Sequence, residues 1–237
     1  MQSVLIAAAV VPAVWLLIKI YRADRLEREP LGLIVSLVLL GIVSTTFAAM
    51  SEQLGETVLS AFYPEGSRPY DLILYFGIVA LSEELFKYLL LRLRTWRSPD
   101  FNCLFDGVVY AVSVSLGFAL WENISYVLQF GMGVAFARAL TAVPGHACFG
   151  VFMGAWYGAA KKRELAGKPG HSARCRWMAV LVPVLLHGSY DFIASQQSEE
   201  MGGIFVGFVA LMFFIAYRLV VHISKHDSYM NPRWDIF

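Results

Sequence analysis

The chain has 237 residues, of which 58% are hydrophobic and 16% are charged, and its mean hydropathy is +0.59. Soluble domains carry about a quarter charged residues, so this composition excludes an ordinary soluble fold. The formal net charge of +1 by itself says nothing about nucleic-acid binding, and the sequence contains no basic domain and no nucleic-acid-binding motif. Cys103, Cys148 and Cys175 are too scattered for a disulfide framework or a paired-cysteine zinc site, so we expect small buried side chains there.

Apolar runs of about 20 residues, the length of a membrane-crossing helix, recur along the whole chain. Only helices and closed barrels satisfy the backbone in lipid, and strict alternation of apolar residues is absent, so the runs predict an all-α polytopic transmembrane bundle. The seven expected spans cover residues 3–20, 31–50, 72–92, 104–128, 134–159, 177–195 and 203–221. No stretch remains for a soluble domain, so residues 1–237 are expected to form a single integral membrane domain. The first positive charge, Lys19, follows the first apolar run, which indicates a retained helix rather than a signal peptide.

The charges between the spans predict the orientation of the chain. Alternate connections and the C-terminal segment hold the basic residues Lys19, Arg22, Arg25, Arg28, Arg92, Arg94, Arg97, Lys161, Lys162, Arg163, Lys168, Arg174, Arg176, Arg218, Lys225 and Arg233. The other connections hold only Arg68 against the acids Glu52, Glu56, Glu65, Asp71, Glu199 and Glu200. The positive-inside rule therefore places the N-terminus outside and the C-terminus in the cytoplasm. Residues 161–176 are then expected to form a cytoplasmic loop, and residues 51–71 the longest outer loop.

Ionisable side chains recur inside the expected spans, although a charge at the bilayer centre costs on the order of 3 kcal/mol. At a rise of about 1.5 Å per residue, Glu83, Glu84, His146 and His187 lie at about one depth, near the middle of the membrane. Their convergence from three helices predicts a functional site. The candidate site residues are Glu83, Glu84, Glu122, His146, His187 and Asp191.

Two further charges are expected to serve the structure on the cytoplasmic side. Lys87 and Asp106 lie near that side on adjacent helices, so the spacing predicts a salt bridge between them. Glu83 and Lys87 form a second possible pair at i and i+4 of one helix. Asp106 also stands in the first turn of its helix, where the helix dipole favours an anion.

Other polar residues lie toward the outer face. Arg138 is expected to neutralise Glu122 or Asp191, and Asn123 to support the site beside Glu122.

Pro144 can kink the fifth span and open a polar cavity, because a proline inside a helix leaves a carbonyl without its partner.

The paired carboxylates suggest acid–base chemistry. In a low-dielectric site two neighbouring carboxylates do not both ionise easily, which provides an acid and a base near neutral pH. Consecutive helix residues point about 100° apart, so one of Glu83 and Glu84 can face a cavity while the other supports it. A carboxylate base with His146 and His187 as donors to an oxyanion suffices for peptide hydrolysis. Alternatively, His146, His187 and Glu122 bind a divalent metal such as Zn²⁺, although the HExxH motif is absent.

Four motifs in order resemble those of the PrsW family of intramembrane proteases. They are Glu83-Glu84-x-x-Lys87, Phe105-Asp106-Gly107 through Gly117-Phe118 to Glu122-Asn123, Thr141-x-x-Pro144-Gly145-His146, and His187-Gly188-x-x-Asp191. They lie in a core at residues 72–195, while the spans at 3–20, 31–50 and 203–221 are peripheral. The type II CAAX prenyl proteases are similar, but their Phe-x-x-x-His motif reads Phe118-x-x-x-Glu122 here, which favours PrsW.

The resemblance implies a protease of the bacterial inner membrane that cleaves a single-pass membrane protein. In the best-known role of the family, that substrate is an anti-sigma factor, cut on its extracytoplasmic side. Glu83 or Glu84 is then the general base, His146 and His187 stabilise the oxyanion or bind metal, and Glu122 and Asp191 orient the histidines or water. The alternatives are a proton- or ion-coupled transporter, which is expected to show inverted repeats, a CAAX-type prenyl protease, and an inactive scaffold.

Overall fold

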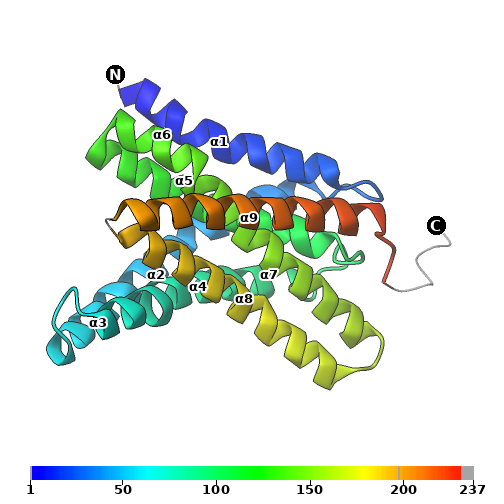
Figure 1. The fold of residues 1–237 in the computed structure, drawn as a ribbon. Helices are drawn as coiled ribbons and strands as arrows, with labels where there is room; N and C mark the ends of the chain where they lie inside the picture. The colour runs from blue at the N-terminus through cyan, green and yellow to red at the C-terminus, as the bar shows by residue number, and fades with distance from the viewer. Residues whose placement is uncertain (1, 197, 231–237) are drawn as a thin grey trace.

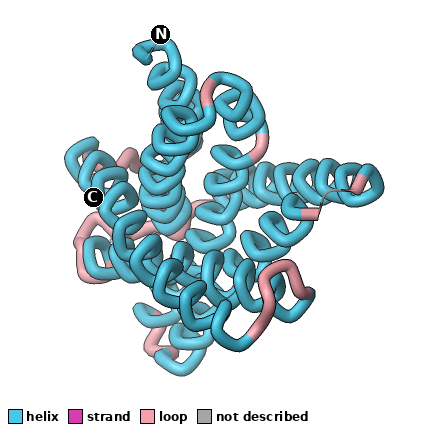
Figure 2. Tube along the Cα trace, turned by 90° about the vertical axis from the view of Figure 1, so that its left-hand side faces the viewer, coloured by secondary structure: helices cyan, strands magenta, loops and turns pink. Residues whose placement is uncertain are grey.

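The computed structural model describes residues 2–196 and 198–230, and within them the chain is helical with short connections and no strand (Figures 1 and 2). The helices are α1 (Gln2–Ala23), α2 (Leu31–Phe62), α3 (Arg68–Leu72), the π-helix η1 (Ile73–Val79), α4 (Ala80–Thr95), α5 (Asp106–Phe130), α6 (Met132–Leu140), α7 (Ala142–Leu165), α8 (Pro169–Ser195) and α9 (Glu199–Lys225). The predicted all-α architecture is confirmed. Arg233, one of the basic residues used to predict the orientation, lies outside the described residues.

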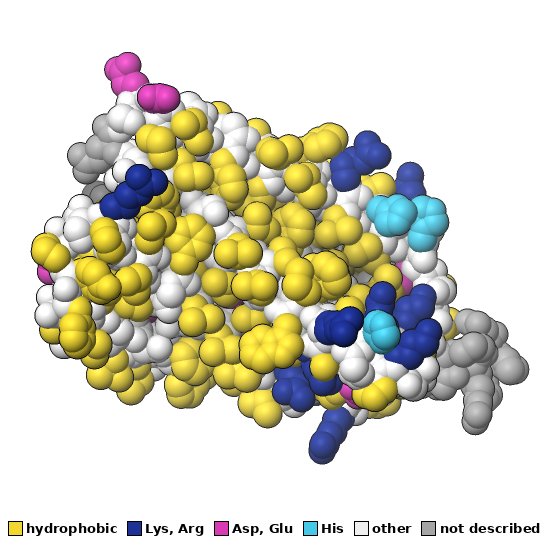
Figure 3. Space-filling view, turned by 60° about the horizontal axis from the view of Figure 1, so that its bottom comes forward, with side chains coloured by type: hydrophobic (Ala, Val, Ile, Leu, Met, Phe, Trp, Pro, Cys, Tyr) yellow, Lys and Arg dark blue, Asp and Glu magenta, His cyan; other side chains and the backbone are white. Residues whose placement is uncertain are grey.

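Six helical segments are long and apolar enough to cross a membrane, which supports the predicted multi-pass protein. They are Ile6–Ala23, Leu31–Phe62, Asp106–Phe130, Met132–Leu165, Pro169–Ser195 and Glu199–Lys225. The remaining expected span, residues 72–92, lies in the unbroken helical stretch 68–95, whose charged residues lower its hydropathy. On the face drawn in Figure 3, hydrophobic side chains form a broad band, and most Lys, Arg and His side chains gather at one end.

Helix α5 forms the centre of the bundle and packs against α7, α2 and α1. Every residue of α5 from 106 to 119 is buried. Its glycines lie against neighbouring backbones: a Cβ at Gly107 would be 2.7 Å from the Gly154 carbonyl oxygen of α7. Small residues at such crossings let helices approach closely, and this contact fixes how α5 and α7 face each other.

Two predicted loops are largely helical. Helix α2 continues to Phe62, so the outer connection predicted at 51–71 shrinks to residues 63–67. Residues 51–62 are polar enough to resemble a loop, yet Glu, Gln, Leu and Ala favour a helix. On the other side α7 ends at Leu165 and α8 begins at Pro169, which shortens the loop predicted at 161–176. Proline is accepted at this first helical position because its missing N–H would be unpaired there anyway.

The span predicted at 134–159 is two helices. The chain leaves helical geometry at Thr141 (φ −121°, ψ −64°), between α6 and α7. Pro144 therefore stands in the first turn of α7, where its lack of an N–H costs no hydrogen bond. The break places Arg138 and His146 on different helices.

Candidate active site

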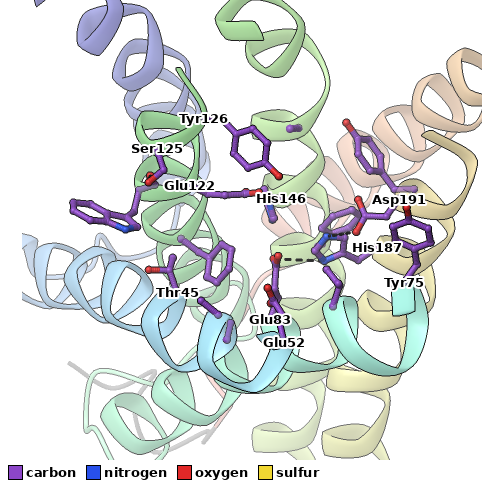
Figure 4. Close-up of a pocket in the computed structure, with 18 of the residues that line it drawn as sticks. Thr45, Glu52, Tyr75, Glu83, Glu122, Ser125, Tyr126, His146, His187 and Asp191 are labelled. Atoms are coloured by element: carbon purple, nitrogen blue, oxygen red, sulfur yellow. Dashed lines mark hydrogen bonds and ion pairs between the residues drawn. The ribbon is translucent and has the colours of Figure 1, made fainter. Parts of the chain in front are cut away.

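A cavity of about 860 Å³ lies among α2, η1, α4, α5, α7 and α8. Five of the six candidate site residues line it, and Figure 4 labels all five: Glu83, Glu122, His146, His187 and Asp191. The sixth, Glu84, lies behind them. Its side chain is fully buried and contacts His187. The structure thus brings the whole predicted set together.

The two glutamates of α4 point to different places. Glu83 lines the cavity and is 6% exposed, whereas Glu84 is fully buried and does not line it. Lys87, also fully buried, lies 3.1 Å from Glu83 Oε2 and 2.7 Å from Glu84 Oε1 through its Nζ atom. One oxygen of Glu84, Oε2, is buried without a hydrogen bond from the described residues.

The predicted salt bridge between Lys87 and Asp106 is wrong. Side chains of a helix lean toward its N-terminus, so the ammonium of Lys87 points back to the residues three and four positions earlier. Asp106 instead accepts hydrogen bonds from the backbone amides of Asn102 (2.9 Å) and Cys103 (2.6 Å) in the loop before α5. Lys87 therefore belongs to the site itself, while the i, i+4 pair that it forms with Glu83 was predicted correctly.

His187 of α8 is held by carboxylates at both ring nitrogens. Nδ1 lies 2.9 Å from Glu84 Oε1 and 3.8 Å from Glu83 Oε2, and Nε2 lies 3.2 Å from Asp191 Oδ2 on the next turn of α8. The ring of Phe149 stacks on the imidazole at 4.7 Å between centroids. These contacts fix the position and the plane of the imidazole ring.

His146 of α7 has a different pair of neighbours. Its Nε2 lies 2.8 Å from Glu122 Oε2 and its Nδ1 3.3 Å from Lys87 Nζ. Glu122 also pairs with Arg138 at 2.9 Å, which is one of the two partners predicted for that arginine. Arg138 Nε donates to Asn123 Oδ1 at 3.1 Å, so Asn123 supports the arginine rather than the histidine.

The site holds more acid than base. The charged groups that these ion pairs join, other than histidine, are Glu83, Glu84, Glu122, Asp191, Lys87 and Arg138. Four carboxylates against two cations give a formal charge of −2 when both histidines are neutral. Buried charge without compensation is costly, so this excess favours protonated histidines, shared protons or a bound cation.

Donor atoms of Glu83, Glu84, His146 and His187 lie within 4.8 Å of one another, and all four residues are buried. Two imidazoles and carboxylate oxygens are a donor set that fits zinc. Glu122, grouped with the histidines from the sequence, contacts His146 but is not one of these four. The ammonium of Lys87 contacts three of the four, so a metal ion bound there would compete with it for the same donor atoms.

Sequence reasoning missed Glu52, which was assigned to the outer loop. It stands on α2 and lines the cavity, and its buried Oε1 receives no hydrogen bond from the described residues. Thr45, Ala48 and Ala49 line the same cavity. Their spacing to Glu52 is that of one helix face, and this periodicity was the available signal.

Comparison with known proteins gives one consistent result. Residues 29–219 match the family described as PrsW family intramembrane metalloprotease. The chain is 33% identical to the protease PrsW of Halalkalibacterium halodurans over 223 residues, which cover 94% of this chain and 98% of the relative. It is 36% identical to that of Geobacillus kaustophilus (97% and 95% covered) and 37% identical to that of Bacillus subtilis (82% and 84% covered). No solved structure matches.

Proposed function

The chain belongs to the PrsW family of intramembrane metalloproteases and is a peptidase of the bacterial membrane, and we propose that Glu83 is its general base. This assignment rests on the different positions of the two glutamates, since Glu83 lines the cavity and Glu84 does not. A base must reach the water whose proton it removes, and of the two carboxylates only the one at the cavity wall is so placed.

The other residues have roles that follow from their contacts. Glu84 holds both the Lys87 ammonium and His187 Nδ1, so it positions these two groups from behind. His187 Nε2 and His146 Nε2 are each oriented by a carboxylate, Asp191 and Glu122. For either imidazole to donate to the oxyanion that develops as water attacks the peptide carbonyl, an N–H now directed at a carboxylate must turn toward the substrate.

If a metal takes part, we propose Zn²⁺ held by His146, His187 and a carboxylate of the glutamate pair. Bound there, zinc would polarise the scissile carbonyl and lower the pKa of water. Glu122 and Asp191 would then serve as the carboxylates that orient metal-binding histidines. The Lys87 ammonium would then lose its contacts with the donor atoms that bind the metal.

We propose a membrane-anchored protein as substrate, cut toward the extracytoplasmic face, with a single-pass anti-sigma factor as the specific candidate. The position of the cavity supports cleavage toward the extracytoplasmic face. The cavity is lined by the second half of α2, the end of α5, the first residues of α7 and the last turns of α8. The positive-inside rule places all four of these regions toward the outer face.

The test uses purified protein in liposomes with a membrane-anchored peptide whose transmembrane segment is labelled at both ends. Glu83→Gln is expected to lower cleavage by about 10²–10⁴-fold, the usual contribution of a general base. Its thermal unfolding should change less than that of Glu84→Gln, because Lys87 keeps its shorter contact with Glu84. Glu84→Gln and His187→Ala are also expected to be inactive, and Glu84→Gln to unfold at lower temperature. Glu56→Gln, an exposed acid one turn farther along α2, is the control. Full activity in Glu83→Gln would refute the assignment.

A further inference from the structure

A second cluster of acids lies at the other end of the bundle. Asp24 and Glu29 stand in the connection between α1 and α2, and Asp106 begins α5. One carboxylate oxygen from each lies within 4.8 Å of the other two, and the residues are only 4%, 3% and 1% exposed. Along α5, Asp106 is about 24 Å from Glu122, so this cluster is separate from the active site.

Apart from a hydrogen bond between the carboxyl groups of Glu29 and Asp106 themselves, the hydrogen bonds to these acids come from neutral groups. Tyr110 donates its hydroxyl to Glu29 Oε2 at 2.6 Å, and Asp106 accepts the two backbone amides already described. Within the described residues, no lysine or arginine forms an ion pair with any of the three acids. The cluster therefore has no cation to balance its charge in this part of the chain.

Asp24 is the least satisfied member. Both of its carboxylate oxygens are buried, and neither receives a hydrogen bond of normal geometry from the described residues, although the backbone amides of Leu26 and Glu27 lie close by. Burial, with Asp227 nearby, raises the pKa of Asp24 to about 6, and burial raises the pKa of Glu29 to about 7. A buried carboxylate without a partner is a costly arrangement, and it points to a ligand that supplies positive charge.

We propose that Asp24, Glu29 and Asp106 form a binding site for a hard divalent cation, Mg²⁺ or Ca²⁺. The three donors are carboxylates, and oxygen ligands are what these ions prefer, whereas zinc favours nitrogen and sulfur. A dication would balance two of the three negative charges. Asp227 lies close to Asp106, with one oxygen of each within 4.8 Å of the other, and its buried Oδ2 has no hydrogen bond in the described residues.

The site would join three parts of the chain. Asp24 follows α1, Glu29 precedes α2, and Asp106 opens α5, the most buried helix. A cation bound by all three ties α1 and α2 to the first turn of α5. Since α5 also carries Glu122 to the cavity, the ion would hold the helix on which one wall of the active site depends.

The experiment counts Mn²⁺ bound to the full-length protein in detergent by electron paramagnetic resonance, with Mn²⁺ as a spectroscopic substitute for Mg²⁺. His187→Ala removes a donor of the active-site cluster and is expected to retain one Mn²⁺ per chain. Asp24→Asn and Glu29→Gln are expected to weaken this binding at least tenfold. Glu27→Gln, which removes an exposed acid from the same connection, is the matched control and should bind Mn²⁺ as the wild type does.

If the variants do not fold, two measurements on the wild-type protein test whether the cation site exists. Histidine nitrogens coordinated to Mn²⁺ produce a hyperfine coupling in pulsed spectra, and the proposed all-oxygen site must lack it. Saturating Mg²⁺ or Ca²⁺ is expected to raise the unfolding midpoint by about 5 °C, because a ligand that binds only the native state stabilises it. The proposal is overturned if no Mn²⁺ binds, if all bound Mn²⁺ shows nitrogen coupling, or if Asp24→Asn binds Mn²⁺ with wild-type affinity.

Discussion

The Lys87 ammonium lies 2.7 Å from Glu84 Oε1, and neither side chain is accessible at the surface. The same nitrogen contacts Glu83 and His146, so one buried cation joins α4 to α7 at the floor of the active site. Breaking a buried pair by removing one partner leaves a bare charge, which costs more than the pair contributes as a whole.

Lys87→Met is therefore expected to lower the free energy of unfolding by about 3–5 kcal/mol. The double variant Lys87→Met/Glu84→Gln should lose less than Lys87→Met alone, since the glutamine leaves no uncompensated charge at that position. Chemical unfolding of Lys87→Met, Glu84→Gln and the double variant in detergent measures the coupling, and Lys162→Met, at an exposed lysine, is the control. Simple addition of the two single effects would show that the pair is not coupled.

Glu52→Gln is expected to reduce cleavage about tenfold, equivalent to about 1.4 kcal/mol in the barrier. The carboxylate lines the same cavity as Glu83 and His187, where a low dielectric strengthens its interaction with the other charged groups of the site. The measurement is kcat/KM for the anchored peptide, compared with Glu56→Gln, an exposed acid one turn farther along α2 that does not line the cavity. Equal losses in the two variants would assign the effect to α2 in general rather than to the cavity.

Arg138→Gln is expected to lower kcat about tenfold with little change in KM. The arginine pairs with Glu122, and Glu122 orients His146, so its loss loosens the imidazole without touching the substrate. Arg138→Lys should recover only part of the rate, because an ammonium cannot hold Glu122 and Asn123 with the fixed fork of a guanidinium. A change confined to KM would instead indicate that Arg138 contacts the substrate.

Removal of metal with 1,10-phenanthroline is expected to abolish cleavage, and Zn²⁺ in excess of the chelator to restore it while Mg²⁺ does not. The reason is the donor set, which joins two imidazoles to the glutamate pair. Elemental analysis must first confirm that the treated protein contains no metal. If that protein still cleaves the peptide, the reaction depends on Glu83 and the Lys87 ammonium without a metal.

Gly154→Ala is expected to lower the free energy of unfolding by about 2–3 kcal/mol. A Cβ there would lie 2.5 Å from Val108 Cα, and a backbone atom of a buried helix cannot move aside cheaply. Gly207→Ala on α9 meets open space and should be neutral or slightly stabilising, since alanine favours helices. Equal thermal unfolding of the two variants would mean that the contact between α5 and α7 is more adaptable than this geometry allows.

The all-helical membrane architecture and the convergence of the six candidate residues followed from the sequence because both rest on short-range rules. The length and hydropathy of a run decide whether a helix crosses lipid. The i, i+4 spacing decides that Glu83 meets Lys87 and that His187 meets Asp191, whatever else surrounds them. Depth along each helix was enough to gather the acids and histidines at one level.

Tertiary packing decided the rest. The rotation of each helix about its own axis decides which glutamate faces the cavity. It also decides that Lys87 contacts His146 and that Glu52 lines the cavity. That rotation is set where backbones touch, as at Gly107 and Gly154, through contacts between residues far apart in the chain. Spacing along one helix determines which of its own side chains share a face, and only its neighbours determine what that face meets.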